Sequence, residues 1–247
     1  MTKKNKAPSS RTPKILADSK FSPLSFEVVK SLKKAGYQAY LVGGCVRDLL
    51  VGIKAKDFDV STNATPEQVR KIFRASRIIG KRFRLVHVFS RNELIEVSTF
   101  RADASKTQNN DGLVKDTDGK ILRDNVWGSL EEDCVRRDFS INALYFDPVE
   151  NVLHDFHNGI EHIQKKSIVS IGDPMLRFEE DPVRSLRAIR FSSKLGFKIS
   201  ETLRKLYIKK PLFLGIFLMQ GCLTNFVKSF FLKKHLIILK SSNHLVH

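Results

Sequence analysis

Two stretches decide the fold class, and they read Leu41-Val42-Gly43-Gly44-Cys45-Val46-Arg47-Asp48-Leu49-Leu50 and Asp57-Phe58-Asp59-Val60. The first predicts a short strand over residues 39–42, a glycine corner and a helix over residues 45–51. The second predicts another strand. Because side chains alternate along a strand, Asp57 and Asp59 should share one face while Phe58 points into the core. Together the stretches predict one strand–helix–strand unit.

The glycine corner and the two carboxylates point to a nucleotide more strongly together than apart. Gly43 and Gly44 let the backbone approach a ligand closely, and the helix start offers free N–H groups to a phosphate. Asp57 and Asp59 repel each other when ionised, and oxygen ligands on one face suit Mg²⁺, which also binds substrate phosphates. Alone, the glycine pair would read as a turn and the carboxylates as a solvated strand edge. Within one unit they predict a triphosphate cradle beside a metal site.

Composition and charge limit the classes to which the chain can belong. The 247 residues hold 43 Lys and Arg against 26 Asp and Glu, a formal net charge of +17. A polyanion such as nucleic acid is the expected partner, with solvated lysine as the alternative. No apolar run has the length of a spanning helix, so no membrane span is expected. The three cysteines lie far apart, which gives no support to a zinc knuckle or a disulfide framework and favours the reducing cytoplasm.

The remaining patterns predict a mixed α/β head followed by helical material. Capping boxes at Thr65 and Ser129 predict helices that run to about Ala75 and toward Asn142. Four more strands are expected over 84–90, 94–100, 144–146 and 152–156, with a polar loop over 101–126 and a last helix over 181–195. We divide the chain into a flexible basic arm (1–20), a head (21–160), a helical neck (161–200) and a divergent basic and apolar tail (201–247).

Three further stretches carry a family resemblance, and they read Ile95-Glu96-Val97-Ser98-Thr99-Phe100-Arg101, Arg136-Arg137-Asp138-Phe139-Ser140-Ile141-Asn142-Ala143-Leu144-Tyr145 and Glu180-Asp181-Pro182-Val183-Arg184. With the first two, they resemble the nucleotidyltransferase head of class II CCA-adding enzymes and bacterial poly(A) polymerases over about residues 24–200. Residues 57–66 and 80–88 are more similar to the poly(A) polymerase I branch. The resemblance implies an α/β nucleotidyltransferase head, a mixed sheet with helices, followed by a short all-α segment.

The resemblance also implies a catalytic centre with two Mg²⁺ ions. Asp57 and Asp59 would bind the ions, and Glu96 on a neighbouring strand would complete a cluster of three carboxylates. Such a centre activates a 3′-hydroxyl, clamps the α-phosphate and stabilises the leaving pyrophosphate. The alternative for Glu96 is an exposed strand glutamate. Asp138 is the third expected catalytic residue.

A nucleotide site is implied around this centre. Arg137, Asp138 and Asn142 would contact the ribose and the triphosphate, with Asp138 and Asn142 on one helix face; a salt-bridge network on the helix surface is the alternative. Gly43 and Gly44 would approach the phosphates.

Three more residues complete the implied site. Arg47 would contact phosphate, with buttressing of the glycine loop as the alternative. Asp181 and Arg184 would read the edge of a purine base, since an acceptor and a donor fork side by side can pair with it. Capping of the last helix is the alternative for Asp181, and both roles are compatible.

The expected function is the addition of AMP from ATP to RNA 3′ ends, on mRNA or tRNA-like substrates. CCA addition to tRNA and an inactive, truncated remnant that binds RNA are the alternatives. The resemblance fades after about residue 200, so we expect a C-terminally truncated family member. The tail over 201–247 then has three readings: a native helical ending, a basic helix that touches a membrane or RNA, or an extension out of frame.

Overall fold

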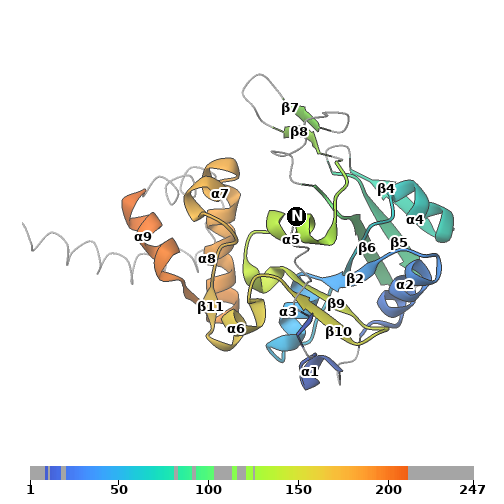
Figure 1. The fold of residues 1–247 in the computed structure, drawn as a ribbon, viewed down its shortest axis with the longest axis horizontal. Helices are drawn as coiled ribbons and strands as arrows, with labels where there is room; N and C mark the ends of the chain where they lie inside the picture. Colours follow the sequence, from blue (N-terminus) through green and yellow to red (C-terminus); the bar gives the residue numbers. More distant parts are fainter. Residues whose placement is uncertain are drawn as a thin grey trace, which may run out of the picture.

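A mixed sheet of eight strands forms the larger part of the protein in this computed structural model (Figure 1). The structure describes residues 9–10, 12–17, 21–80, 83–90, 93–102, 113–115, 121–124 and 126–210. Across the sheet the strands are β1 (Ser9–Ser10), β10 (Val152–Asp155), β9 (Leu144–Asp147), β2 (Ala39–Val42), β3 (Asp59–Thr62), β6 (Glu93–Thr99), β5 (Leu85–Ser90) and β4 (Ser76–Ile79). Only β3 and β6 run parallel among these neighbours. The strands expected from the sequence at 39–42, 84–90, 94–100, 144–146 and 152–156 are confirmed.

Helices cover both faces of this sheet. On one face lie α2 (Pro23–Lys34) and α4 (Pro66–Ile72), and on the other lies α5 (Leu130–Arg136). Alternation along β2 explains the two layers, because Ala39 and Leu41 belong to the core under α2 while Tyr40 and Val42 pack with Leu130 of α5. Side chains in register with Val42 therefore lie on the α5 face.

Local capping signals set where the helices begin. Thr65 and Ser129 each form the expected capping box, so α4 and α5 start where the sequence predicts. The helix α3 (Gly44–Leu50) starts at Gly43, whose φ of +75° lies in the region that favours glycine. The strand–corner–helix predicted from the opening stretch is thus confirmed.

Helical material follows the sheet and packs around a second core. Its elements are α6 (Gly159–Gln164), α7 (Pro174–Glu180), α8 (Val183–Leu195) and α9 (Glu201–Lys209), with a short parallel pair formed by β11 (Ser167–Ile168) and β12 (Lys198–Ile199). Figure 1 shows α7, α8 and α9 together beside the sheet. Phe139 precedes the short 3-10 helix η1 (Ser140–Asn142), and Ile141 lies within it. Both are buried in this core with Phe178 of α7 and Ala188 of α8. An α/β head followed by helices is therefore confirmed, while the exact domain boundaries stay a prediction.

Several local expectations are wrong. The strand with the paired carboxylates begins only at Asp59, so Asp57 precedes it. The helix that starts at Ser129 ends at Arg136 instead of reaching Asn142, because the chain turns into an extended conformation at Arg137. The helix that starts at Thr65 ends at Ile72, and the strand β4 follows it unpredicted. Helices α6 and α7 were not expected from the sequence either.

Two segments expected to lack regular structure contain some. The polar loop over 101–126 includes a hairpin of β7 (Leu113–Lys115) and β8 (Ile121–Asp124). Within the expected flexible arm, β1 pairs with β10 and α1 (Lys14–Ala17) places Leu16 fully inside the core. Apolar burial of Leu16 anchors this short helix to the head.

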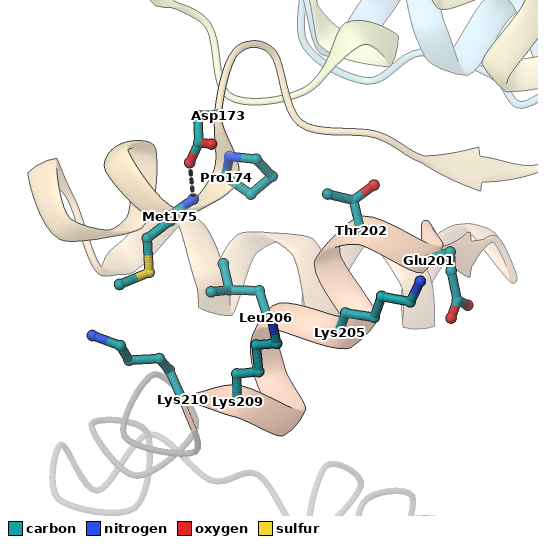
Figure 2. A pocket seen from close by; sticks show the side chains of 9 residues that line it. All are labelled: Asp173, Pro174, Met175, Glu201, Thr202, Lys205, Leu206, Lys209 and Lys210. Carbon is teal, nitrogen blue, oxygen red and sulfur yellow. Dashed lines mark hydrogen bonds between the residues drawn. The ribbon is translucent and has the colours of Figure 1, made fainter.

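Only the start of the predicted tail falls within the described residues. It forms α9, and residues 211–247 lie outside them. A cavity of about 570 Å³ lies between α7 and α9. Figure 2 shows Met175 and Leu206 on its walls with Lys205, Lys209 and Lys210 around it, and no candidate site residue lines it. No helix in the described part of the chain is long and apolar enough to cross a membrane.

Candidate active site

A row of side chains across three strands places acidic groups next to one another. In the sheet register Asp59 of β3 pairs with Val42 of β2 on one side and with Glu96 of β6 on the other. His87 of β5 follows Glu96, and its Nε2 atom lies 3.3 Å from a Glu96 carboxylate oxygen. Paired residues in a sheet point to the same face, so Asp59, Glu96 and His87 share the face that α5 covers.

Asp59 is surrounded by like charge. Burial raises the pKa of its carboxyl to about 6, and the charges of Glu96 and Asp57 act in the same direction, while Arg137 opposes them. No hydrogen bond from the described residues contributes to this shift. Asp57 is exposed just before the strand, and Phe58 between the two is buried as predicted. The carboxyl is thus held where its ionised form is unfavourable without a cation.

The predicted cluster of three carboxylates is not assembled. No group of three or more His, Cys, Asp or Glu side chains close enough to hold a metal ion occurs among the described residues. Half of the Glu96 side chain is exposed and it faces His87, which agrees with the alternative of a strand glutamate. The donor set of Asp57 and Asp59 still fits Mg²⁺, because both supply carboxylate oxygens and the pKa of Asp59 stays raised despite the opposing charge of Arg137.

The glycine corner lies against Arg137. A Cβ atom on Gly43 would stand in van der Waals contact with Nη1 of Arg137, at 3.4 Å, and the φ of +75° is what disfavours other residues at this position. The guanidinium stacks over the Tyr145 ring, 4.9 Å from its centroid, and its Nε atom donates to the Tyr145 hydroxyl oxygen at 2.6 Å. That hydroxyl donates in turn to Asp133 at 2.6 Å. Arg137 is therefore fixed between the corner and the sheet.

Arg47 belongs to a buried chain of polar groups. Its Nη1 atom donates to Asn142 Oδ1 at 2.6 Å, and its Nε and Nη2 atoms donate to Asp48 at 2.8 and 2.6 Å. Asn142 donates to Asp138 Oδ1 at 3.1 Å, and Arg187 of α8 donates to Asp138 Oδ2 at 2.7 Å. Arg47 is 3% exposed. These contacts favour the buttressing alternative for Arg47, and its contact with phosphate stays a prediction.

The grouping of Asp138 with Asn142 arises differently from the sequence prediction. They do not share a face of one helix, because α5 has ended before them. The hydrogen bond between their side chains brings them together instead. Asp138 is 8% exposed and also accepts from the backbone N–H of Phe139 at 2.8 Å.

The expected base-reading pair lies at the start of α8. The Nε atom of Arg184 is 4.0 Å from Oδ2 of Asp181, so acceptor and donor fork stand side by side. Asp181 also accepts from the backbone N–H of Val183 at 3.1 Å and thus supports the helix start as well. Nη1 of Arg184 donates to Glu180 at 2.9 Å.

Several residues of this region were not predicted from the sequence. They are Asp133, Tyr145, Arg177, Arg187, Phe191 and Lys194, the last of which donates to Asp48 Oδ2 at 3.1 Å. Arg187 had a usable signal, because it follows Arg184 by three residues on a helix and must share its face. Phe191 lies one further turn along, where its ring stacks with Arg47 at 4.9 Å and Arg187 at 5.6 Å.

Comparison with known families agrees with this geometry. The Poly A polymerase head domain family matches residues 39–169, more than half of the chain. The chain belongs to this family. The matched range contains the glycine corner, the acidic row and the segment from Arg137 to Asn142, so it includes most of the candidate site of this head domain.

Individual relatives of the head domain place the chain nearer to one branch. Poly(A) polymerase I of Haemophilus influenzae is 50% identical over 176 residues, which are 71% of this chain and 39% of the relative. The CCA-adding enzyme of Geobacillus kaustophilus is 38% identical over 70% of this chain and 41% of the relative. The crystal structure of the Bacillus stearothermophilus CCA-adding enzyme in complex with CTP matches with a TM-score of 0.63 at 34% identity, over 76% of this chain and 44% of the other.

These matches confirm the fold class and the predicted resemblance. They also show that the chain spans about two fifths of the length of the curated relatives it matches. The activity of a whole relative is therefore a proposal for this chain.

Proposed function

We propose that the chain is the catalytic head of a template-independent RNA nucleotidyltransferase, which adds AMP from ATP to RNA 3′ ends. The observation that carries the proposal is Asp59, a carboxyl with a raised pKa among other carboxylates, next to the Gly43–Arg137 corner. Higher identity to a poly(A) polymerase I than to a CCA-adding enzyme supports ATP as the nucleotide.

Each part of the site has a role in this proposal. Asp57 and Asp59 are the residues that would hold Mg²⁺, and Glu96 lies next to Asp59 in the sheet. Bound there, Mg²⁺ would lower the pKa of an RNA 3′-hydroxyl and stabilise the charge on the phosphates. Gly43 and Gly44 leave space for the triphosphate, and Arg137 presents a fixed positive charge at the same corner.

Nucleotide positioning and selection would fall to the neighbouring segments. Asp138 and Asn142 would contact the ribose, and Asp181 with Arg184 would pair with the base edge. Arg47 would support this contact through Asn142. RNA 3′ ends are the proposed partner, and the two described cysteines, both buried and free, fit a cytoplasmic setting.

Offering the four ribonucleoside triphosphates one at a time tests the proposal. The chain is incubated with Mg²⁺ and a labelled RNA, and we expect extension with ATP and little with the other three. No extension with any triphosphate, even at high protein concentration, would contradict the proposal. Salt-sensitive RNA binding without extension would support the alternative of an inactive RNA-binding remnant.

CCA addition is the second candidate, supported by the identity to CCA-adding enzymes. A tRNA that lacks its CCA end separates the two. A poly(A) polymerase should add AMP to it without prior CTP incorporation, whereas a CCA-adding enzyme should incorporate CMP first.

A further inference from the structure

Arg177 of α7 caps the helix that leads into the candidate nucleotide site. Its Nη2 atom donates to three consecutive backbone carbonyl oxygens at the end of α5, those of Val135 at 3.3 Å, Arg136 at 2.6 Å and Arg137 at 3.0 Å. The last carbonyls of a helix have no partner within it, and a cation there is favoured by the helix dipole. Arg177 thus holds the backbone of the segment that carries Arg137, and Nη2 of Arg184 adds a longer contact of 3.5 Å to the Arg136 carbonyl oxygen.

The other arm of the same guanidinium reaches the base-reading pair. Nη1 of Arg177 donates to Oε2 of Glu180 at 2.9 Å, and this oxygen also accepts from Nη1 of Arg184 at 2.9 Å. Glu180 therefore lies between two guanidinium groups and orients Arg184 beside Asp181. The side chains of Arg177 and Arg184 are 17% and 14% exposed, whereas that of Glu180 is 48% exposed, so both guanidinium groups are held in place while their shared carboxylate faces solvent.

The capped segment leads directly into the candidate site. Arg137 stands against Gly43, and the next residue, Asp138, is the buried carboxylate that Asn142 and Arg187 hold. A planar guanidinium carries two separate NH2 groups, so Arg177 can donate to the α5 carbonyls with one and to Glu180 with the other, which a lysine ammonium cannot do.

We infer that Arg177 is a positioning residue that couples the base-reading pair, Asp181 and Arg184, to the nucleotide-contacting segment at Arg137 and Asp138. This inference rests on the proposed function. Arg177 touches no substrate in this scheme and acts through Glu180 and the α5 carbonyls. The expected consequence is that it sharpens the preference for ATP over CTP as well as stabilising α5.

The variants Arg177→Lys and Arg177→Ala separate these two effects. Lysine can still cap α5 with its ammonium but cannot also reach Glu180, so Arg177→Lys should keep the thermal midpoint near that of the unchanged chain. Both variants should lower the ratio of CTP to ATP dissociation constants about ten-fold, a common size for coupling between sites. Arg190→Lys is the control, because Arg190 is an exposed arginine on α8.

Titration calorimetry with ATP and with CTP gives this ratio without turnover, so it stays readable if the chain adds no nucleotide. Unchanged discrimination in Arg177→Lys would overturn the inference and leave Arg177 as a helix cap alone. In an Arg184→Ala background, Arg177→Lys should lower discrimination no further, and an additional loss there would also overturn the inference. Binding of ATP without extension would contradict the proposed function alone, and binding of neither nucleotide would contradict both.

Discussion

Asp59 and Asp138 are both partly or fully buried beside Arg137, yet their surroundings are opposite. Asp138 accepts hydrogen bonds from Asn142, Arg187 and a backbone N–H. Asp59 has carboxylates as its neighbours and a pKa raised to about 6. A buried carboxylate that serves the fold is normally paired, because desolvation is costly without a donor. The contrast therefore distinguishes a carboxyl group with a raised pKa among other carboxylates, as a metal ligand would have, from one that the protein itself pairs with donors.

Among the variants that test this contrast, Asp59→Asn should have the largest effect, which is on the rate of AMP incorporation. If Asp59 holds Mg²⁺, the loss of its charge should slow AMP incorporation about a thousand-fold or more, since metal stabilisation of the transition state is worth several kcal/mol. Single-turnover extension of labelled RNA measures the rate. Glu27→Gln on the exposed side of α2 removes one charge away from the site and should change little. An Asp59→Asn rate within ten-fold of the unchanged chain would contradict the metal role.

Removing Arg47 should instead damage the fold. Arg47→Met leaves Asp48 and Asn142 without their buried partner, and loss of one member of such a pair costs about 3–5 kcal/mol of the free energy of unfolding. Urea denaturation measures this, with Arg190→Met as the exposed control. Asp59→Asn should cost nothing at pH 7, because a carboxyl whose folded pKa lies above its unfolded value destabilises the fold once it is ionised. Equal losses in Arg47→Met and Asp59→Asn would remove the contrast.

Added Mg²⁺ should raise the thermal midpoint of the chain through Asp59, a smaller effect that tests the same contrast between Asp59 and Asp138. An ion that binds only the folded chain raises its thermal midpoint, by about 3 °C or more when the concentration is well above the dissociation constant. The shift should disappear in Asp59→Asn and persist in Glu27→Gln. NaCl at matched ionic strength corrects for general screening. A shift of the same size in Asp59→Asn would place the ion elsewhere.

The parts of the fold that depend on local signals could be predicted from the sequence. The capping boxes at Thr65 and Ser129 and the corner at Gly43 each require particular residues within a few positions, so the helix starts were predicted correctly. Helix ends were predicted less well. The helix α5 ends at Arg136 because Phe139 and Ile141 are drawn into the second core and Arg177 caps the carbonyls from a distant helix.

The candidate site shows the same limit. Asp59 and Glu96 could be paired from strand patterns and the family resemblance, and the register confirms that they are neighbours. The surroundings of Arg47 could not be predicted, because its partner Asn142 lies 95 residues away in sequence. A buried arginine and a phosphate-binding arginine look alike in sequence, because the burial of Arg47 depends on the packing of α3 against η1.

The pH dependence of the free energy of unfolding should show the smallest effect, and it distinguishes Asp59 from the buried histidines. Burial lowers the pKa values of His154, His157 and His162 below 6.5, so the unfolded chain binds their protons more tightly. Their contribution to stability is complete above pH 6.5 and is lost as the pH falls through the lower folded values. Asp59 acts with the opposite sign: its contribution is present below pH 3.8 and is lost as the pH rises through about 6.

These opposite signs can be separated by urea titrations between pH 4 and 7. Asp59→Asn removes a term that falls with pH, so its free energy of unfolding should rise more steeply with pH than that of the unchanged chain. His154→Phe removes a term that rises with pH, so its free energy of unfolding should rise less steeply than that of the unchanged chain. Phenylalanine is chosen because the His154 ring stacks on Phe156 and a phenyl ring can take its place. Parallel curves for the unchanged chain and Asp59→Asn would mean that the Asp59 carboxyl is solvated like a surface aspartate. Its unfavourable surroundings, and with them the contrast to Asp138, would then be lost.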